Sequence, residues 1–253
     1  MDFTHLYETF RALEDPNFWQ DAYMKFYRAW FEADRWKQYF EGLATTVQVT
    51  VMALIIGVIL GVVVAMIRTA HDQQRPGRRN PFLGVVNFLC KVYVTIIRGT
   101  PLMVQLLIMG LVTFASNRNK TIIGALSLGI NSGAYVAEII RGGLMSLDPG
   151  QNEAGRSLGL GYFDTMRFIV IPQAFKAVLP ALGNEFITLL KDTSLISVIG
   201  GKEIVYFAQA IITRTYETMY PYLITAVMYL IMVLIFTWLQ SKLERRLRQS
   251  DRR

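Results

Sequence analysis

Residues 42–67 read GLATTVQVTVMALIIGVILGVVVAMI, and no charged side chain interrupts them between Glu41 and Arg68. A helix needs about 20 consecutive apolar residues to cross the hydrocarbon core of a bilayer. This run of 26 residues is therefore long enough to span a membrane, and it decides the fold class. Gly57 and Gly61 lie one helical turn apart within it, a spacing that lets a second helix approach closely in lipid.

Four further segments share this apolar character and predict four more spans. With the first span at 43–67, they cover 99–117, 121–140, 175–195 and 222–239. The second span has two candidate starts, because the residues from Pro81 to Ile97 are also apolar apart from one lysine. Only 18% of the residues are charged, below the ~25% that is typical of soluble domains. The sequence thus predicts an all-α integral membrane protein with five transmembrane helices.

Basic residues predict how these spans are oriented. The tail 242–253 holds six lysines and arginines against two acids, and four arginines, at positions 68, 75, 78 and 79, follow the first span. Cytoplasmic loops are enriched in such residues, so both regions are expected in the cytoplasm. Five spans then place the N-terminus outside. We expect an extracytoplasmic segment 1–41, a transmembrane domain 42–241 and a basic cytoplasmic tail.

Aromatic residues recur at helical spacing in the first segment, at Trp19, Tyr23, Phe26, Tyr27 and Trp30. Charged residues lie between them, which predicts an amphipathic helix at the outer membrane interface. An aromatic stripe packed against neighbouring spans explains the pattern equally well. Docking of an external partner is a third interpretation.

A polar, glycine-rich stretch, 148–172, separates the third and fourth spans and is predicted to be cytoplasmic. Asp148 suits an N-cap and Pro149 suits the first helical position. A helix is therefore expected from Pro149 to Leu158. The sequence Gly159-Leu160-Gly161 is expected to end it, since glycine readily adopts the left-handed conformation of a C-cap.

A second helix is expected from Tyr162 until just before Pro172. Gly155 and Gly159 lie one turn apart in the first helix and would leave a smooth face for another protein surface. A plain connector between two spans explains the same residues. From the residues alone, docking and connection are equally good interpretations.

A resemblance favours docking. Glu153-Ala154-Gly155, three residues, Gly159, nine residues, Ile169, one residue and Ile171-Pro172 resemble the EAA motif of ABC importer permeases. The resemblance implies that the loop contacts an ATP-binding subunit through six residues: Glu153, Ala154, Gly155, Gly159, Leu160 and Gly161. Gly155 stands where a second alanine is usual, and Ile171 replaces the usual leucine before the proline.

Three more motifs resemble the polar amino acid permeases of the His/Gln/Arg/cystine type. They are RGTPLMVQ at 98–105, AYVAEIIRGG at 134–143 and KDTSL at 191–195. This resemblance implies the five-helix (MetI-like) permease core in a bacterial cytoplasmic membrane, with the N-terminus outside and the C-terminus in the cytoplasm.

The same resemblance implies the partners. They are two ATP-binding subunits, a second permease chain, identical or related, and an extracytoplasmic amino-acid-binding protein. The sequence contains no Gly-x-x-x-x-Gly-Lys-[Ser/Thr] motif, so this chain is not expected to cradle ATP phosphates itself. We expect no enzyme activity and no bound cofactor in this chain, with ATP and Mg used by the partner ATPase.

Other ligand classes have little support in the sequence. His5 and His71 are isolated and lie outside the predicted spans, so no metal site is expected. Basic residues are not interleaved with stacking aromatics, which argues against nucleic-acid binding.

The fourth span carries charges that are costly in a membrane and therefore tend to face a partner or a water-filled path. Glu185, Thr188 and Asp192 lie at i, i+3 and i+7, on one face of a helix. With the neighbouring Thr193 and Ser194, they are our candidates for the substrate pathway. The family resemblance implies that the equivalents of Glu185 and Asp192 lie near the translocation cavity. A structural ion pair, with Lys191 neutralising a carboxylate from another span, is the alternative.

Arg98, Gly99 and Pro101 predict a break at the start of the second span, because proline removes a helical hydrogen bond. This break is a candidate gate or hinge. A plain helix start, with Arg98 reaching to the headgroups, explains it as well. Glu138 and Arg141, at i and i+3, are expected to form a local ion pair.

The leading functional prediction is the permease subunit of an ATP-driven importer for a polar or charged amino acid. A secondary transporter driven by an ion gradient is one alternative, but it predicts internal repeats that are not found here. A non-transporting membrane scaffold is the other, and it would not need acids in the fourth span.

Overall fold

The structure, a computed structural model, describes residues 3–74, 80–148 and 150–250, and all regular secondary structure within them is helical. The helices are α1 (Phe3–Arg11), α2 (Phe18–Trp30), η1 (Glu32–Asp34), α3 (Arg35–Asp72), α4 (Pro81–Gly99), α5 (Leu102–Leu107), η2 (Ile108–Thr113), α6 (Lys120–Met145), α7 (Gly150–Ser157), α8 (Tyr162–Thr165), η3 (Met166–Val170), α9 (Ile171–Asp192), η4 (Thr193–Ile199), α10 (Ile204–Thr215) and α11 (Met219–Ser250).

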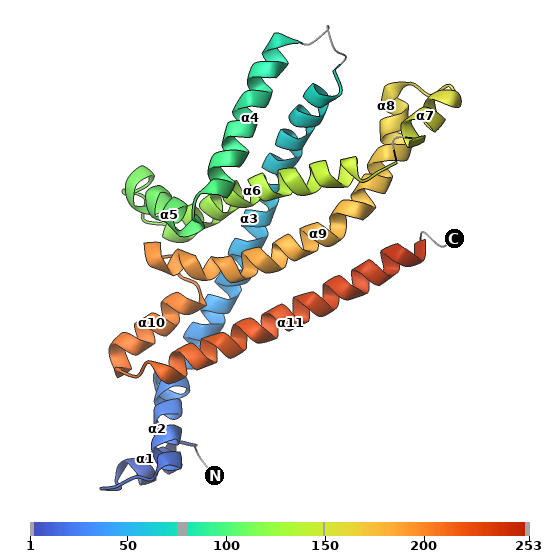
Figure 1. Ribbon diagram of the computed structural model, residues 1–253. Helices are drawn as coiled ribbons and strands as arrows, with labels where there is room; N and C mark the ends of the chain where they lie inside the picture. Colours follow the sequence, from blue (N-terminus) through green and yellow to red (C-terminus); the bar gives the residue numbers. More distant parts are fainter. Residues whose placement is uncertain (1–2, 75–79, 149, 251–253) are drawn as a thin grey trace.

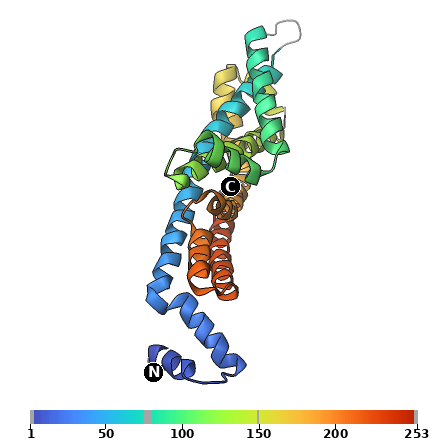
Figure 2. The ribbon, with the colours of Figure 1, turned by 90° about the vertical axis from the view of Figure 1, so that its left-hand side faces the viewer.

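Five of the described helical segments are long and apolar enough to cross a membrane. They are Glu32–Asp72, Pro81–Gly99, Lys120–Met145, Phe163–Ile199 and Met219–Arg246. In Figure 1, α3 runs through the middle of the molecule, α4 lies beside its C-terminal half, and α6, α9 and α11 cross it. The view in Figure 2 shows that the molecule is elongated, with α1 and α2 at one end. The predicted fold class is confirmed.

The second span differs from the predicted segment 99–117. The membrane-length helix is α4, and it ends at Gly99, where Thr100 adopts an extended conformation (φ −121°, ψ 147°). Pro101 causes this, because its ring disfavours the helical conformation in the preceding residue. The residues after it form only a short apolar helix, Leu102–Thr113. The prediction therefore placed the span one helix too late.

The helix predicted to stop before Pro172 in fact continues through it. The π-helical turn η3 precedes α9, and Pro172 lies in the first turn of α9. A proline lacks the N–H that a helix interior needs, and its ring collides with the carbonyl of the fourth residue before it. A wider π turn relieves that collision. The segment from Phe163 to Ile199 is therefore continuously helical.

The centre of the fold is the contact between α3 and α6. A Cβ atom placed on Gly61 would lie 2.5 Å from Val136 Cγ1, and one on Gly57 would lie 2.9 Å from Ser132 Oγ. Only glycine fits at this distance, so the predicted close approach is confirmed. Small residues at such contacts let helices gain van der Waals contact in lipid, where the hydrophobic effect does not drive them together.

The N-terminal segment forms a helical hairpin. Asn17 and Gln20 make a capping box at the start of α2, with hydrogen bonds of 3.0 and 2.8 Å. Tyr27 stacks on Tyr7 of α1 with ring centroids 4.5 Å apart, and Trp30 stacks on Tyr39 of α3 at 5.5 Å. The aromatic stripe therefore packs largely against neighbouring helices. Its position at the outer interface stays a prediction.

The predicted boundary at residue 41, between the extracytoplasmic segment and the transmembrane domain, lies inside a helix. Helix α3 begins at Arg35 and runs through that position without a break. Residues 35–41 are thus part of the same helix as the first span.

The α3–α6 contact predicts that replacing a helical glycine with alanine destabilises this protein. In an open helix the same change is ordinarily stabilising. Gly61→Ala should lower the free energy of unfolding by about 1–3 kcal/mol, because the added methyl group collides with Val136. Gly84→Ala is the matched control, since nothing lies within 4 Å of a Cβ placed on Gly84 in α4. That change should instead stabilise by about 0.5–1 kcal/mol through helix propensity. Thermal unfolding in detergent measures both, and equal shifts would contradict the assigned contact.

Candidate functional site

The helices α7 and α8 form an elbow that projects beyond the bundle (Figure 1). The predicted caps are confirmed at both described ends of α7. The backbone N–H of Gly150 donates to Asp148 Oδ1 at 2.8 Å, and Gly159 has a left-handed conformation with φ 77°. Leu160 N–H then donates to the Gly155 carbonyl at 3.1 Å, which closes the C-terminal turn. The predicted start at Pro149 lies outside the described residues.

Gly155 faces the inside of the elbow, which corrects the prediction that it forms an open docking face. A Cβ atom on Gly155 would lie 2.6 Å from Cγ2 and 2.7 Å from Oγ1 of Thr165 in α8. Thr165 is itself buried. This close contact explains why glycine stands where the EAA pattern has alanine, since a methyl group would push α7 and α8 apart.

The open surface of the elbow is instead formed by two large apolar side chains that sequence analysis missed. Leu158 is 76% exposed and Phe163 is 84% exposed, one on each side of the turn at Gly159. Glu153 and Ala154 are exposed beside them. Large apolar side chains that are exposed on both sides of one turn are typical of a surface that another protein covers. Their presence in a polar loop was the available signal.

The break between α4 and α5 is held by Gln105. Its Nε2 donates to the carbonyl of Ile97 and to Oγ1 of Thr100, both at 2.8 Å. Its Oε1 accepts from Asn131 Nδ2 of α6 at 2.9 Å. The amide therefore replaces hydrogen bonds that Pro101 interrupts and fastens the break to α6. Sequence analysis named the break but missed this residue.

A cluster of charges surrounds Glu138 on α6. The predicted pair with Arg141 is present, with Nη2 to Oε2 at 3.3 Å. Arg68 of α3 also pairs with this carboxylate, and Arg98 Nη1 lies 3.7 Å from Oε2. Arg98 further lies 5.4 Å from the ring centroid of Tyr135. Arg98 is therefore directed toward α6, whereas the interpretation as a plain helix start expected it to reach to the headgroups. The Glu138 carboxylate joins α3, α4 and α6.

The acids of the fourth span have different surroundings. Glu185 Oε1 accepts a hydrogen bond from Ser132 Oγ of α6 at 2.7 Å. Both Glu185 and Asp192 are half-buried, and Thr188 between them is exposed. Across residues 3–74, 80–148 and 150–250, no ion pair involves either carboxylate or Lys191. The alternative of a pair with Lys191 is therefore not found.

The two hydroxyl residues that follow Asp192 bond to the backbone. Thr193 is fully buried and donates to the Leu190 carbonyl at 2.7 Å. Ser194 donates to the Lys191 carbonyl at 2.7 Å. Thr193 therefore lies in the interior of this chain, and Ser194 is half-buried, so their place in the substrate pathway stays a prediction.

A further buried acid, Glu203, was missed because it lies between two predicted spans. It is fully buried at the start of α10, and it accepts the N–H groups of Val205 and Tyr206 at 2.7 and 2.8 Å. The Tyr229 hydroxyl of α11 donates to it at 2.9 Å. Burial raises the pKa of this carboxyl group. Its partners are all within the fold, so Glu203 fixes α10 against α11.

Residues 80–249 match the family described as binding-protein-dependent transport system inner membrane component. The arginine transport system permease protein ArtQ of Bacillus subtilis (strain 168) is 37% identical over 216 residues, covering 83% of this chain and 93% of that protein. The glutamine transport system permease protein GlnP of Escherichia coli (strain K12) is 38% identical over 168 residues, covering 65% and 77%.

Two solved structures are also similar. A chain in the crystal structure of an amino acid ABC transporter with histidines has a TM-score of 0.74 and 42% identity, covering 83% of this chain and 94% of that one. A chain of the MetNI methionine ABC transporter in an inward-facing conformation has a TM-score of 0.69 at 17% identity, covering 83% and 96%. The latter likeness shows a common fold.

The charge cluster gives a stability prediction. Glu138→Gln should lower the free energy of unfolding by about 2–3 kcal/mol. The change removes the one negative charge with which the guanidinium groups of three arginines pair. Glu41→Gln is the control, since Glu41 is exposed and the change should stay within about 0.5 kcal/mol. Denaturant unfolding of the purified chain in detergent measures both. A Glu138 variant as stable as the control would show that the cluster contributes nothing.

Proposed function

Because the chain belongs to the family of inner membrane components of binding-protein-dependent transport systems, and is the membrane permease of an ABC importer for amino acids, we propose how its residues divide that work. The α7–α8 elbow contacts a separate ATPase subunit, and the acids of α9 meet the substrate. The chain lies with its N-terminus outside and its C-terminus and elbow in the cytoplasm.

The observation that carries the proposal is the environment of Glu185. Its carboxylate lies half-buried in a membrane-spanning helix, and its one hydrogen-bond partner in the described structure is the neutral hydroxyl of Ser132. An ionisable group in a membrane span is costly, and such groups commonly pair with an opposite charge or mark a substrate pathway. An α-ammonium or guanidinium group of a passing amino acid supplies such a charge. Asp192, two turns along the same face, offers the next acceptor.

The exposed apolar side chains of the α7–α8 elbow support the proposed contact with an ATPase subunit. Leu158 and Phe163 present an apolar contact surface of the kind that an apolar cleft in a partner covers, with Glu153 at its edge. ATP binding draws two ATPase subunits together and moves two such elbows, one from each of two permease chains. The spans then open outward, and an external binding protein delivers the amino acid. The permease family supports an ATP-driven importer over an ion-driven transporter or a scaffold.

Substrate contact predicts a selective defect. Glu185→Gln should reduce uptake of a cationic amino acid by about tenfold, equivalent to about 1.4 kcal/mol, and uptake of a neutral one by less. The assay is ATP-driven uptake into vesicles that contain the permease, its ATPase and its binding protein. Glu41→Gln serves as the control for loss of an acid elsewhere. An equal loss for both substrates would assign Glu185 a structural role.

Elbow docking predicts uncoupling. The three single variants Leu158→Ser, Phe163→Ser and Glu153→Lys should leave membrane insertion unchanged but should weaken binding of the ATPase subunit. For Leu158→Ser and Phe163→Ser, each of which removes one apolar side chain from the contact, we expect a loss of about tenfold in affinity. The control is Leu13→Ser, an exposed leucine in the segment that joins α1 to α2, and Figure 1 shows these two helices at the opposite end of the molecule from α7 and α8. Co-purification of the ATPase and transport per ATP hydrolysed are the readouts. Wild-type coupling in all three elbow variants would place the contact elsewhere.

A further inference from the structure

The side chain of Gln240 connects the last span to α9 beside the proline inside that helix. Its Nε2 atom donates to the Pro180 carbonyl at 3.2 Å and to Asn184 Oδ1 at 2.9 Å, both in α9. The same atom lies 3.0 Å from Glu244 Oε1, one turn further along α11. An amide nitrogen carries two N–H groups, so three acceptors compete for two donors. Gln240 can therefore exchange one acceptor without losing its attachment to α9.

Gly183 lets this amide approach the α9 backbone closely. A Cβ atom placed on Gly183 would lie 2.9 Å from Cδ and 3.0 Å from Cγ of Gln240, so a larger residue would displace the amide. Phe186 and Phe236 add an apolar contact between the same two helices, edge to face at 4.8 Å. Apolar contacts are not directional. The hydrogen bonds of Gln240 therefore set the register of α9 on α11.

The contact lies where α9 bends most easily. Pro180 lies inside α9 and supplies no N–H to it, and helices bend at such residues. The elbow precedes this turn, and Glu185 follows it by five residues. Asn184 directly precedes Glu185, which accepts a hydrogen bond from Ser132 of α6. Gln240 thus fastens α9 between the elbow and the carboxylate proposed to meet the substrate.

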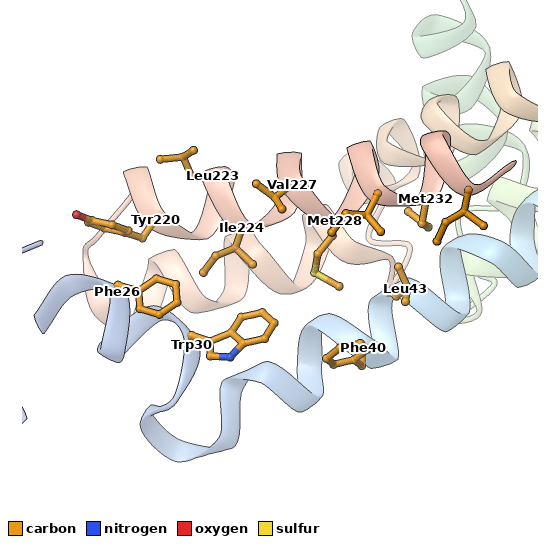
Figure 3. A pocket seen from close by; sticks show the side chains of 12 residues that line it. Phe26, Trp30, Phe40, Leu43, Tyr220, Leu223, Ile224, Val227, Met228 and Met232 are labelled. Atoms are coloured by element: carbon orange, nitrogen blue, oxygen red, sulfur yellow. The ribbon is translucent and has the colours of Figure 1, made fainter. Parts of the chain in front are cut away.

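Helix α11 is itself attached to other helices, so it can serve as a support for α9. Figure 3 shows Met228 of α11 facing Trp30 of α2, and both pack against one apolar cluster. The next residue, Tyr229, donates to Glu203 at the start of α10 at 2.9 Å. The contact from Gln240 is therefore a fixed point for α9 on a unit that contains α2, α10 and α11.

We propose that Gln240 is a positioning residue for transport, the pivot at which α9 turns on α11. The proposal rests on the roles proposed above for the elbow and for Glu185. When a bound ATPase moves the elbow, Gln240 keeps the turn from Pro180 to Asn184 against α11. The far half of α9 then turns about that point instead of sliding along α11. Glu244 accepts one N–H when an α9 acceptor turns away, so neither donor is left unpaired, which would be costly.

Removing the two donors tests the pivot. Gln240→Leu keeps a similar volume without any side-chain N–H, and Gln209→Leu, a change at an exposed glutamine in α10, is the matched control. The assay uses vesicles that contain the permease, its ATPase and its binding protein. In Gln240→Leu, ATPase binding should stay within about twofold of wild type, whereas transport per ATP hydrolysed should fall about tenfold. Transport per ATP equal to that of Gln209→Leu would overturn the proposal.

A cross-link can replace the hydrogen bonds. Gln240 Cγ lies 3.0 Å from a Cβ placed on Gly183 and one C–C bond of about 1.5 Å from its own Cβ. The two Cβ atoms are therefore within about 4.5 Å, which is close enough for a disulfide. The test protein carries Gly183→Cys and Gln240→Cys, with Cys90→Ala to remove the native thiol. Each single cysteine variant controls for effects of oxidation alone.

A pivot tolerates this cross-link, whereas a contact that has to open does not. The oxidised double variant should transport within about twofold of wild type per ATP, and dithiothreitol should lower that value reversibly by about tenfold. Loss of transport on oxidation would show that α9 has to separate from α11 at this point. That result, or equal transport in the oxidised and reduced states, would overturn the proposal.

Substrate selectivity separates this proposal from the one for Glu185. Gln240→Leu should lower uptake of cationic and neutral amino acids equally, because it acts on the movement of α9. Glu185→Gln should instead lower uptake of the cationic one more. An unselective defect in Glu185→Gln would remove the substrate contact and leave the pivot in place. A loss in Gln240→Leu that is confined to cationic substrates would overturn the pivot.

Discussion

The close contact between α3 and α6 fixes the position of α6, the helix that carries Ser132 and Glu138. Gly57 brings the α3 backbone against Ser132, and Ser132 holds the Glu185 carboxylate of α9. Six residues further along α6, Glu138 pairs with Arg68 of α3. Ser132 thus connects α6 to α9, and Glu138 connects α6 to α3. If α3 and α6 were separated by even one methyl group, the contact between Arg68 and Glu138 would lengthen, because a packed interior has no free volume to absorb the change.

The three acids near the centre differ in how they are compensated, and this difference separates structure from function. Glu138 has three arginines, and Glu203 has two backbone N–H groups and a tyrosine hydroxyl. Glu185 has a serine hydroxyl. A carboxylate whose hydrogen-bonding capacity is met by the fold stabilises that fold, whereas one left short of partners is costly unless a ligand completes it. Of the three acids, Glu185 is therefore the one that we propose to meet a cationic substrate.

Sequence reasoning succeeded where a feature is local to one helix. The apolar runs located four of the five spans, and Asp148 and Gly159 gave the ends of α7. The Glu138–Arg141 pair also follows from spacing alone. It failed where one helix meets another. Gln105 is an unremarkable amide in its own helix until Asn131 faces it, and Gly155 seemed open because Thr165 lies on a different helix. Pro101 and Pro172 look alike in sequence, yet only the first ends a helix, because a π turn precedes the second.

That π turn has a consequence for the proposed mechanism. Since the chain remains helical from Phe163 to Ile199, the elbow connects to Glu185 through a continuous helix. The 22 residues from Phe163 to Glu185 span about 33 Å at 1.5 Å per residue. A flexible loop of that length would dissipate a displacement at its far end, whereas a helix transmits it and bends mainly where its hydrogen bonding is interrupted. Pro180 and the π turn are such places, so movement of the elbow would reach Glu185 as a tilt of α9 about one or both of them.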